Sequence, residues 1–222
     1  MKILRILLFI PVLLLTACNV ENYETGDDEM SYMRADFARV HSGEAGTLVS
    51  AVTDEGDSLV LTPPLDCEWA TTPDSTYRAL LYYKAQFEGL KVEGIQAANV
   101  LTLRIPEKRP RDIFTDPVHL QSSWVSTNRQ YLNLSLGVMT GKVEGSDAKQ
   151  GIGIVRDTVT TADDGHQVHH LRLYHNQNGQ PEYYTSRLYV SVPLTGFKQG
   201  DEVRMEVNTY AGKIVKSYII QP

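Results

Sequence analysis

The densest set of side chains that could do chemistry lies between residues 163 and 175. It consists of Asp163, Asp164, His166, His169, His170 and His175. Imidazole and carboxylate groups are zinc ligands, so such a set could in principle hold a metal ion. In a strand, however, His166 and His170 share one face about 13 Å apart, and His169 lies on the other face. We therefore predict no metal site, and interpret these histidines as exposed turn and hairpin residues.

Other motifs of known chemistry are incomplete or absent. Residues 137–142 are similar to a phosphate-binding loop, but the motif is one residue short and no Ser or Thr follows Lys142. Residues 133–135 match a glycosylation sequon within a strand that has the pattern of a core strand. The sequence contains no Gly-x-Ser-x-Gly, His-Glu-x-x-His or Cys-x-x-Cys. We predict no catalytic residue and no cofactor.

Aromatic side chains offer a second kind of chemistry, because they can stack on sugar rings. The candidates are Trp69, Trp124, Tyr82, Tyr183 and Tyr184. In β-rich chains such residues more often pack in the core or as cross-strand pairs. A glycan- or peptide-binding surface therefore stays an alternative, which a cleft lined by these rings would favour.

Cys18 is the residue to which the sequence assigns specific chemistry. Lys2 and Arg5 precede an apolar run at residues 6–15, and small residues at 16 and 17 complete a secretory signal. The pattern Leu-x-Ala-Cys that ends at Cys18 resembles the bacterial lipobox, whose thiol accepts a diacylglycerol. One acyl chain holds a protein only marginally, whereas several give stable anchoring. We predict a signal peptide at residues 1–17 and a lipid anchor at Cys18.

The rest of the composition limits the cell compartment and the partners. After acylation of Cys18 only Cys67 remains, so we expect no intrachain disulfide and a small buried apolar role for Cys67. Removal of Lys2 and Arg5 with the signal moves the formal net charge from −6 to −8. An acidic chain is a poor partner for nucleic acid. Residues 18–30 are polar and acidic, and we predict a flexible tether there.

A period of two dominates the chain from Ser31 onward and predicts strands. We expect strands at 32–40, 47–53, 58–62, 77–88, 90–95 and 99–105, with Pro63 and Pro64 ending the third. Such a set of short, curled strands favours a small OB-like barrel over residues 31–106. The proline-containing segment of mixed charge that follows predicts a linker at residues 107–117.

A second alternating series predicts a second domain at residues 118–222. We expect strands near residues 131–138, 152–160, 171–174, 184–193, 203–207 and 214–220. Asn178-Gly179 is a strong signal for a β-hairpin turn. Seven or so antiparallel strands in about 100 residues describe a β-sandwich. The fold class is therefore all-β, a small OB-like barrel followed by an antiparallel β-sandwich, with no helical periodicity.

Several stretches of the chain resemble one known family. They are Asp116-Pro117 with Trp124, and then residues 130–134, 171–176, 178–179 and 189–194. Together with the lipobox they resemble the NigD-like lipoproteins of Bacteroides-type bacteria. The resemblance implies an N-terminal OB-like domain, a C-terminal β-sandwich and a lipoprotein of the cell envelope. It also implies a role in bacteriocin immunity and no catalysis.

These observations lead to one functional prediction and two alternatives. We expect a non-enzymatic lipoprotein of the outer membrane, on its periplasmic or surface face, anchored through Cys18. Its partners would be the membrane and an unidentified envelope protein, and not nucleic acid. The first alternative is a glycan- or peptide-binding module. The second, an enzyme or metal protein that uses the histidine set, would require three His or Asp side chains to converge on one point.

Overall fold

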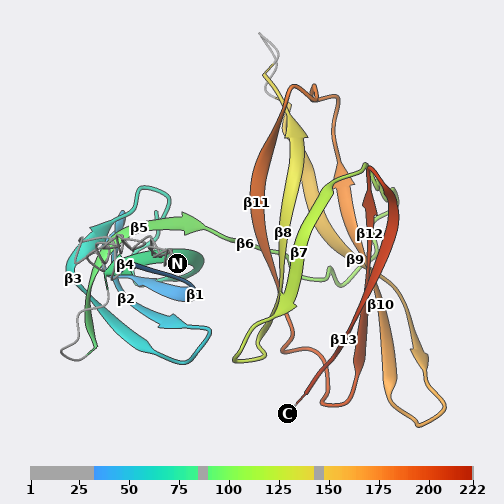
Figure 1. The fold of residues 1–222 in the computed structure, drawn as a ribbon, viewed down its shortest axis with the longest axis horizontal. Coiled ribbons are helices and arrows are strands. Elements are labelled where there is room, and N and C mark those ends of the chain that lie inside the picture. The colour runs from blue at the N-terminus through green and yellow to red at the C-terminus, as the bar shows by residue number, and fades with distance from the viewer. Residues whose placement is uncertain (1–32, 85–89, 143–147, 222) are drawn as a thin grey trace, which may run out of the picture. The chain divides into compact units, whose positions relative to one another are not determined.

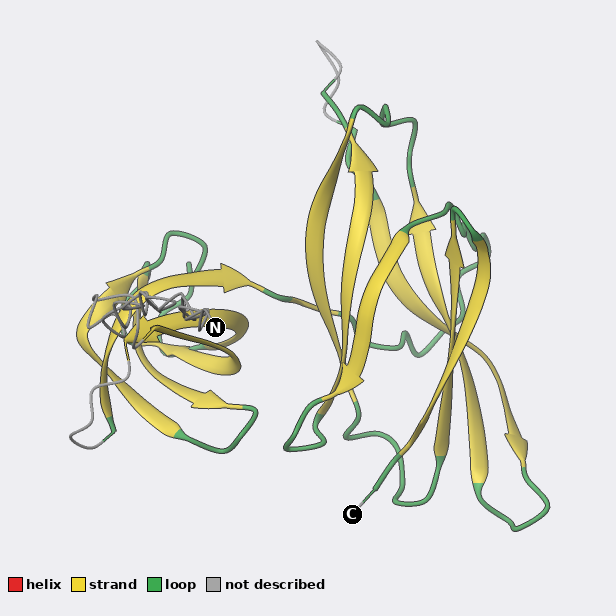
Figure 2. Ribbon diagram, in the orientation of Figure 1, coloured by secondary structure: helices red, strands yellow, loops and turns green. Residues whose placement is uncertain are grey.

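The computed structural model describes residues 33–84, 90–142 and 148–221. Within these ranges the chain forms thirteen β-strands and no helix (Figures 1 and 2). The all-β prediction is therefore confirmed. No helix among the described residues is long and apolar enough to cross a membrane. Cys18 and the acidic segment up to residue 30 lie outside the described residues.

The first five strands close into a barrel in the order β1-β2-β3-β5-β4. They are β1 (Met33–Ser42), β2 (Thr47–Thr53), β3 (Ser58–Asp66), β4 (Thr76–Lys84) and β5 (Lys91–Asn99). Neighbouring strands are antiparallel except β3 and β5, which pair in parallel. A five-stranded closed barrel of this kind confirms the OB-like prediction.

Alternate residues of these strands fill the barrel. Ala38 and Val40 of β1 and Leu81 of β4 are fully buried in one apolar cluster. Cys67 belongs to the same cluster at 6% exposure, which confirms its predicted role. Burial also raises the pKa of the Cys67 thiol, which keeps it protonated and unreactive.

The remaining strands form two four-stranded sheets that enclose a second core. The first sheet has the order β6-β11-β8-β7 and the second β13-β12-β10-β9. Their bounds are β6 (Leu101–Thr102), β7 (His119–Val125), β8 (Tyr131–Thr140), β9 (Gly151–Thr161), β10 (Gln167–Asn176), β11 (Tyr184–Pro193), β12 (Glu202–Thr209) and β13 (Gly212–Ile219). Leu132, Leu134 and Leu136 of β8 pack with Leu171 of β10 and Met205 of β12. This is the expected β-sandwich, although the pairs β10–β12 and β6–β11 are parallel.

Three local predictions were wrong in informative ways. The strand expected at 99–105 is not part of the barrel, because residues 101 and 102 form β6 and pair with β11. Pro63 and Pro64 do not end β3, because they fall between Val60 and Leu65, where the register with β2 shifts and the ladder is interrupted.

The third difference concerns the turn at Asn178-Gly179. Both residues have positive φ, and the Gln180 N–H donates to the carbonyl of Gln177, so the expected tight turn is present. It does not make a hairpin, however, because β10 and β11 belong to different sheets. The predicted domain boundaries, including the linker at 107–117, stay predictions.

Candidate functional site

The histidines singled out in the sequence do not converge. Among the described residues, no group of three His, Cys, Asp or Glu side chains is arranged to hold a metal ion. His166 contacts Asp164 in the turn before β10, and His170 Nε2 lies 3.1 Å from Thr160 Oγ1 on β9. His166 thus contacts its own turn and also lies 3.9 Å from Glu202 Oε2 of β12, while His170 contacts the neighbouring strand β9.

His169 and His175 are buried, which contradicts their interpretation as exposed residues. His169 and His175 share the period of two with the core residues Leu171 and Leu173 of β10, so both side chains face inward. His169 Nε2 lies 3.0 Å from Asp201 Oδ2. Burial acts to raise the pKa of Asp201, but hydrogen bonds from the Lys198 N–H and from His169 outweigh it and lower that pKa.

His175 connects three segments of the sandwich. Its Nδ1 lies 3.0 Å from the carbonyl oxygen of Asp116, and its Nε2 lies 3.1 Å from Gln150 Oε1. The side chain is 1% exposed. These contacts explain the histidine as a structural residue that fixes the segment before β7 and the start of β9 against β10.

The aromatic candidates do not share a surface. Trp69 packs against the barrel core and donates its indole N–H to the carbonyl of Ala97 at 3.1 Å. Trp124 packs edge-to-face against Phe37, with ring centroids 5.3 Å apart. Only Tyr183 and Tyr184 are strongly exposed, at 75% and 54%. The aromatic platform that the glycan-binding alternative requires is therefore reduced to this tyrosine pair.

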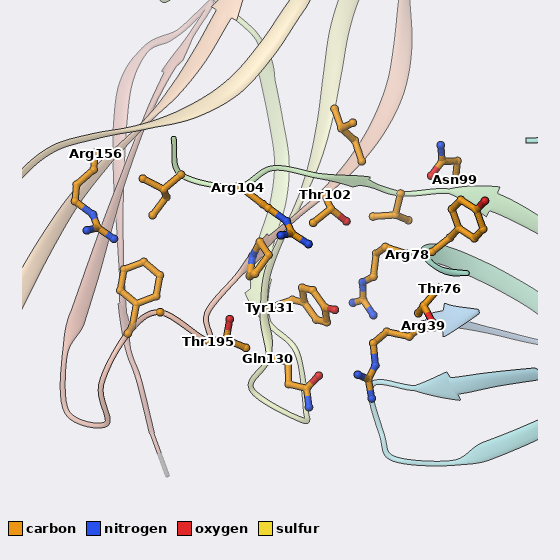
Figure 3. A pocket seen from close by; sticks show the side chains of 17 residues that line it. Arg39, Thr76, Arg78, Asn99, Thr102, Arg104, Gln130, Tyr131, Arg156 and Thr195 are labelled. Atoms are coloured by element: carbon orange, nitrogen blue, oxygen red, sulfur yellow. The ribbon is translucent and has the colours of Figure 1, made fainter. Parts of the chain in front are cut away.

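A cleft of about 730 Å³ lies where barrel strands β1 and β4 meet the segment around β6 and the sandwich. Its charged lining consists entirely of arginines: Arg39, Arg78, Arg104 and Arg156 (Figure 3). Thr76, Asn99, Thr102, Gln130, Tyr131 and Thr195 add hydroxyl and amide groups. None of the described residues that line the cleft is acidic, although the chain carries a net charge of −6.

Arg78 forms the buried wall of this cleft and joins the barrel to the sandwich. Its Nη1 and Nη2 donate to the two carboxylate oxygens of Asp54 at 2.7 and 2.5 Å, and its Nε donates to Ser191 Oγ on β11 at 3.2 Å. The guanidinium also lies 4.0 Å from the centre of the Tyr131 ring. Arg78 faces out of the barrel, and it is only 5% exposed because the sandwich covers that face.

The other three arginines have no carboxylate partner among the described residues. Arg39 points outward from β1, since its neighbours Ala38 and Val40 fill the barrel. Arg104 follows the buried Leu103 and is exposed. Arg156 of β9 lies over the Phe197 ring at 5.6 Å, and its Nε is buried without a hydrogen-bond acceptor. In Figure 3, Arg104 lies between Arg156 and Arg78.

Sequence reasoning missed this cleft. Its arginines come from β1, β4, the segment after β6 and β9, so no local spacing connects them. One available signal was Arg78, which alternation places on the outer face of the strand expected at 77–88. Such a face must be either exposed to solvent or covered by another domain.

The comparison of the sequence with known families gives a clear result. A family model described as the NigD-like C-terminal beta sandwich domain matches residues 103–221. The chain belongs to the NigD-like family. The match covers the strands from β7 to β13, and it confirms the resemblance that the sequence motifs indicated. No curated protein matches the chain.

Solved structures agree with this NigD-like assignment at the level of the fold. A NigD-like immunity protein from Bacteroides caccae is 20% identical, covers 84% of this chain and 96% of its own, and has a TM-score of 0.63. A protein of unknown function from Bacteroides vulgatus is 19% identical, with coverages of 86% and 90% and a TM-score of 0.63. A candidate lipoprotein from Bacteroides fragilis is 13% identical, with coverages of 86% and 98% and a TM-score of 0.56.

Proposed function

We propose that this NigD-like chain is a lipid-anchored protein of the outer membrane that binds an envelope protein and catalyses no reaction. The observation that carries the proposal is the arginine-lined cleft, which gives an acidic chain one concentrated basic site. Lipidation at Cys18 would keep this site at the membrane. Membership of the NigD-like family supports an immunity role as the specific form of this function.

The chemistry of the cleft supports binding rather than catalysis. Its four charged groups are guanidiniums, and its described lining contains no Asp, Glu, His, Lys or Cys, the side chains that most often act as general acids or bases. They are well suited to hold carboxylates or other planar anions through paired hydrogen bonds. Colicin DNases and their immunity proteins, for comparison, associate by tight non-covalent binding.

The proposal is tested by recovery of a partner from native envelopes. The full-length chain with a C-terminal tag is expressed in a Bacteroides-type host, and the envelopes are solubilised in mild detergent. We expect one envelope protein to co-purify in a fixed ratio with the tagged chain, and not with an unrelated tagged lipoprotein expressed at the same level. Failure to recover such a protein in repeated purifications would overturn the binding function.

The immunity role has a separate readout. A strain from which the gene is deleted should become sensitive to a secreted toxin of a competing strain, and a copy of the wild-type chain should restore resistance. A deletion strain that is as resistant as its parent to all competitors tested would refute immunity, while the partner-binding function could still hold.

A glycan-binding module is the second candidate, and the exposed Tyr183 and Tyr184 favour it. Exposed tyrosine rings can stack on sugars. If this function is correct, binding to a glycan array should be detectable for the wild-type chain and lost in Tyr183→Ala/Tyr184→Ala. An array without signal for the wild-type chain would exclude it.

A further inference from the structure

We infer that the arginine-lined cleft binds an extended, acidic peptide segment of a protein partner. The carboxylates of this segment would meet Arg39, Arg104 and Arg156, and its backbone would lie along the free edge of the chain at β6. This inference rests on the proposed function, because it names the chemical class of the segment by which the protein partner is bound.

The first step is the charge that the cleft leaves without a counter-charge. Arg39 and Arg78 are directly opposite each other on β1 and β4, and like charges in this position destabilise a strand pair. Asp54 neutralises Arg78, but no described carboxylate neutralises Arg39. Arg104 likewise lacks an ion pair within the described residues, and the Nε of Arg156 is buried without an acceptor. Three unneutralised guanidiniums beside one cleft indicate an anionic ligand.

The second step concerns the aromatic rings of the cleft, which are already occupied. The guanidinium of Arg78 covers the Tyr131 ring, and Arg156 lies over Phe197. Tyr77 packs edge-to-face against Trp69, and its hydroxyl donates to the carbonyl of Thr72 at 3.2 Å. Because a sugar needs an open ring face on which to stack, these contacts favour an anion held by guanidiniums over a glycan.

The third step is the backbone of the segment that lines the cleft. β6 is the edge strand of its sheet and pairs with β11 through two residues only. The Leu103 N–H donates to the Ser191 carbonyl of β11, so by the alternation of a strand the backbone groups of Thr102 and Arg104 point away from β11. Thr102 and Arg104 line the cleft. An extended peptide can pair with such an edge, which gives affinity through main-chain hydrogen bonds.

The size of the cleft fits a short segment and not a folded domain. Its volume of about 730 Å³ falls in the range of clefts that enclose small ligands. The arginines come from both the barrel and the sandwich, so the bound segment would contact both. A partner with an exposed acidic loop or terminus satisfies these conditions.

The test uses a fluorescent hexapeptide in which Glu alternates with Thr, and the full-length lipidated chain in detergent micelles. We expect saturable binding at low salt that weakens as the salt concentration rises, because the contacts are electrostatic. A peptide with Gln in place of Glu should not bind. A peptide that is N-methylated at alternate residues keeps its carboxylates, and it should bind several-fold more weakly because it lacks the donors that pair with the β6 edge.

Two charge-matched variants assign the binding to the cleft. Arg39→Gln/Arg104→Gln/Arg156→Gln should lower the affinity for the acidic peptide by about tenfold or more. Lys91→Gln/Arg187→Gln/Lys216→Gln removes the same charge from exposed positions that do not line the cleft, and should change the affinity by less than about threefold. Thermal melting of both variants checks that they fold, which we expect because none of the three cleft arginines forms an ion pair with a described residue.

Three outcomes would overturn the inference. They are unchanged peptide binding in the cleft variant, an equal loss of binding in both variants, or binding of a sulfated polysaccharide without binding of the acidic peptide. Partner recovery from envelopes separates this failure from failure of the proposed function. If the cleft variant still recovers the partner, the partner binds elsewhere and the proposed function stands. If the wild-type chain recovers none, the proposed function itself fails.

Discussion

Arg78 is a buried cation whose guanidinium is satisfied from two sides. Asp54 of the barrel accepts two hydrogen bonds from it, and Ser191 of the sandwich accepts a third. Arg78→Ala would leave the carboxylate of Asp54, which is 8% exposed, without its partner. Removal of one member of a buried ion pair costs about 3–5 kcal/mol. We expect a loss of this size in the free energy of unfolding, measured by urea denaturation.

A matched variant separates the charge of Arg78 from its geometry. Arg78→Lys keeps the positive charge but cannot donate two parallel hydrogen bonds to Asp54 and a third to Ser191. Its stability should therefore lie between those of the wild type and Arg78→Ala. A loss of less than about 1 kcal/mol in Arg78→Ala would show that the buried pair contributes little.

Glu202 predicts a pH dependence of stability. Hydrogen bonds from the Arg204 guanidinium, at 2.8 and 2.9 Å, are the main cause that lowers the pKa of Glu202 to about 2. In an unfolded chain the pKa of a Glu is about 4.3. Because the folded value is the lower one, the contribution of Glu202 to stability is complete above the unfolded pKa and is lost as the pH falls toward 2.

The comparison of wild type with Glu202→Gln isolates this contribution from that of other carboxylates. At neutral pH the wild type should have the higher urea midpoint. The difference between the two midpoints should shrink as the pH is lowered below about 5, because the wild-type side chain becomes neutral too. A difference that stays constant from neutral to acidic pH would contradict the role given to Arg204.

At the residue scale, the sequence predicts what depends on neighbours along the chain. The burial of Cys67 and the alternation of Ala38 and Val40 could be predicted, because composition and period determine them. The environment of Arg78 could not, since its partner Ser191 is 113 positions away in the chain. The burial of His169 and His175 could also have been predicted, because both share the period of two with the core residues Leu171 and Leu173.

At the scale of elements, β8 requires a glycine where it passes between two neighbours. Gly137 is paired with His119 of β7 and Arg187 of β11. A Cβ at this position would lie 2.8 Å from Thr185 Cγ2 and 3.2 Å from His119 Cβ. Gly137→Ala should therefore lower the free energy of unfolding by about 1–3 kcal/mol through overpacking, measured by urea denaturation.

Gly153 of β9 is the matched control for this prediction. A Cβ there would meet the Tyr174 ring at 3.7 Å, which is an ordinary contact. Gly153→Ala should thus change stability by no more than about 0.5 kcal/mol, or raise it slightly. Equal losses in the two variants would mean that the loss reflects the change of residue type and not the crowding around β8.

The strands themselves were largely predictable, because their period of two is a local property. Which strands pair was less predictable. The Asn178-Gly179 turn has the expected local conformation, yet β11 joins the other sheet, since turn chemistry does not determine the partner of the next strand. Likewise, residues 101 and 102 pair with β11 instead of extending the barrel, because the chain leaves the barrel at Val100.

At the scale of the whole molecule, the proposed membrane attachment would use Cys18, which lies outside the described β-domains. The chain has a net charge of −6, and an acidic protein gains no electrostatic attraction to anionic lipids. No helix in the described ranges can span a bilayer. The attachment that we propose is through acyl chains at Cys18, each methylene of which contributes about 0.8 kcal/mol when buried in lipid.

We expect the wild-type chain to incorporate a clickable palmitate analogue in growing cells and to sediment with the membranes. Cys18→Ala, placed behind an ordinary cleavable secretory signal, should lose the label and move to the soluble fraction. Cys67→Ala is the matched control and should keep both label and membrane association, because Cys67 is buried in the barrel at 6% exposure. Label that persists in Cys18→Ala, or a membrane fraction that does not change, would refute the lipid anchor at this residue.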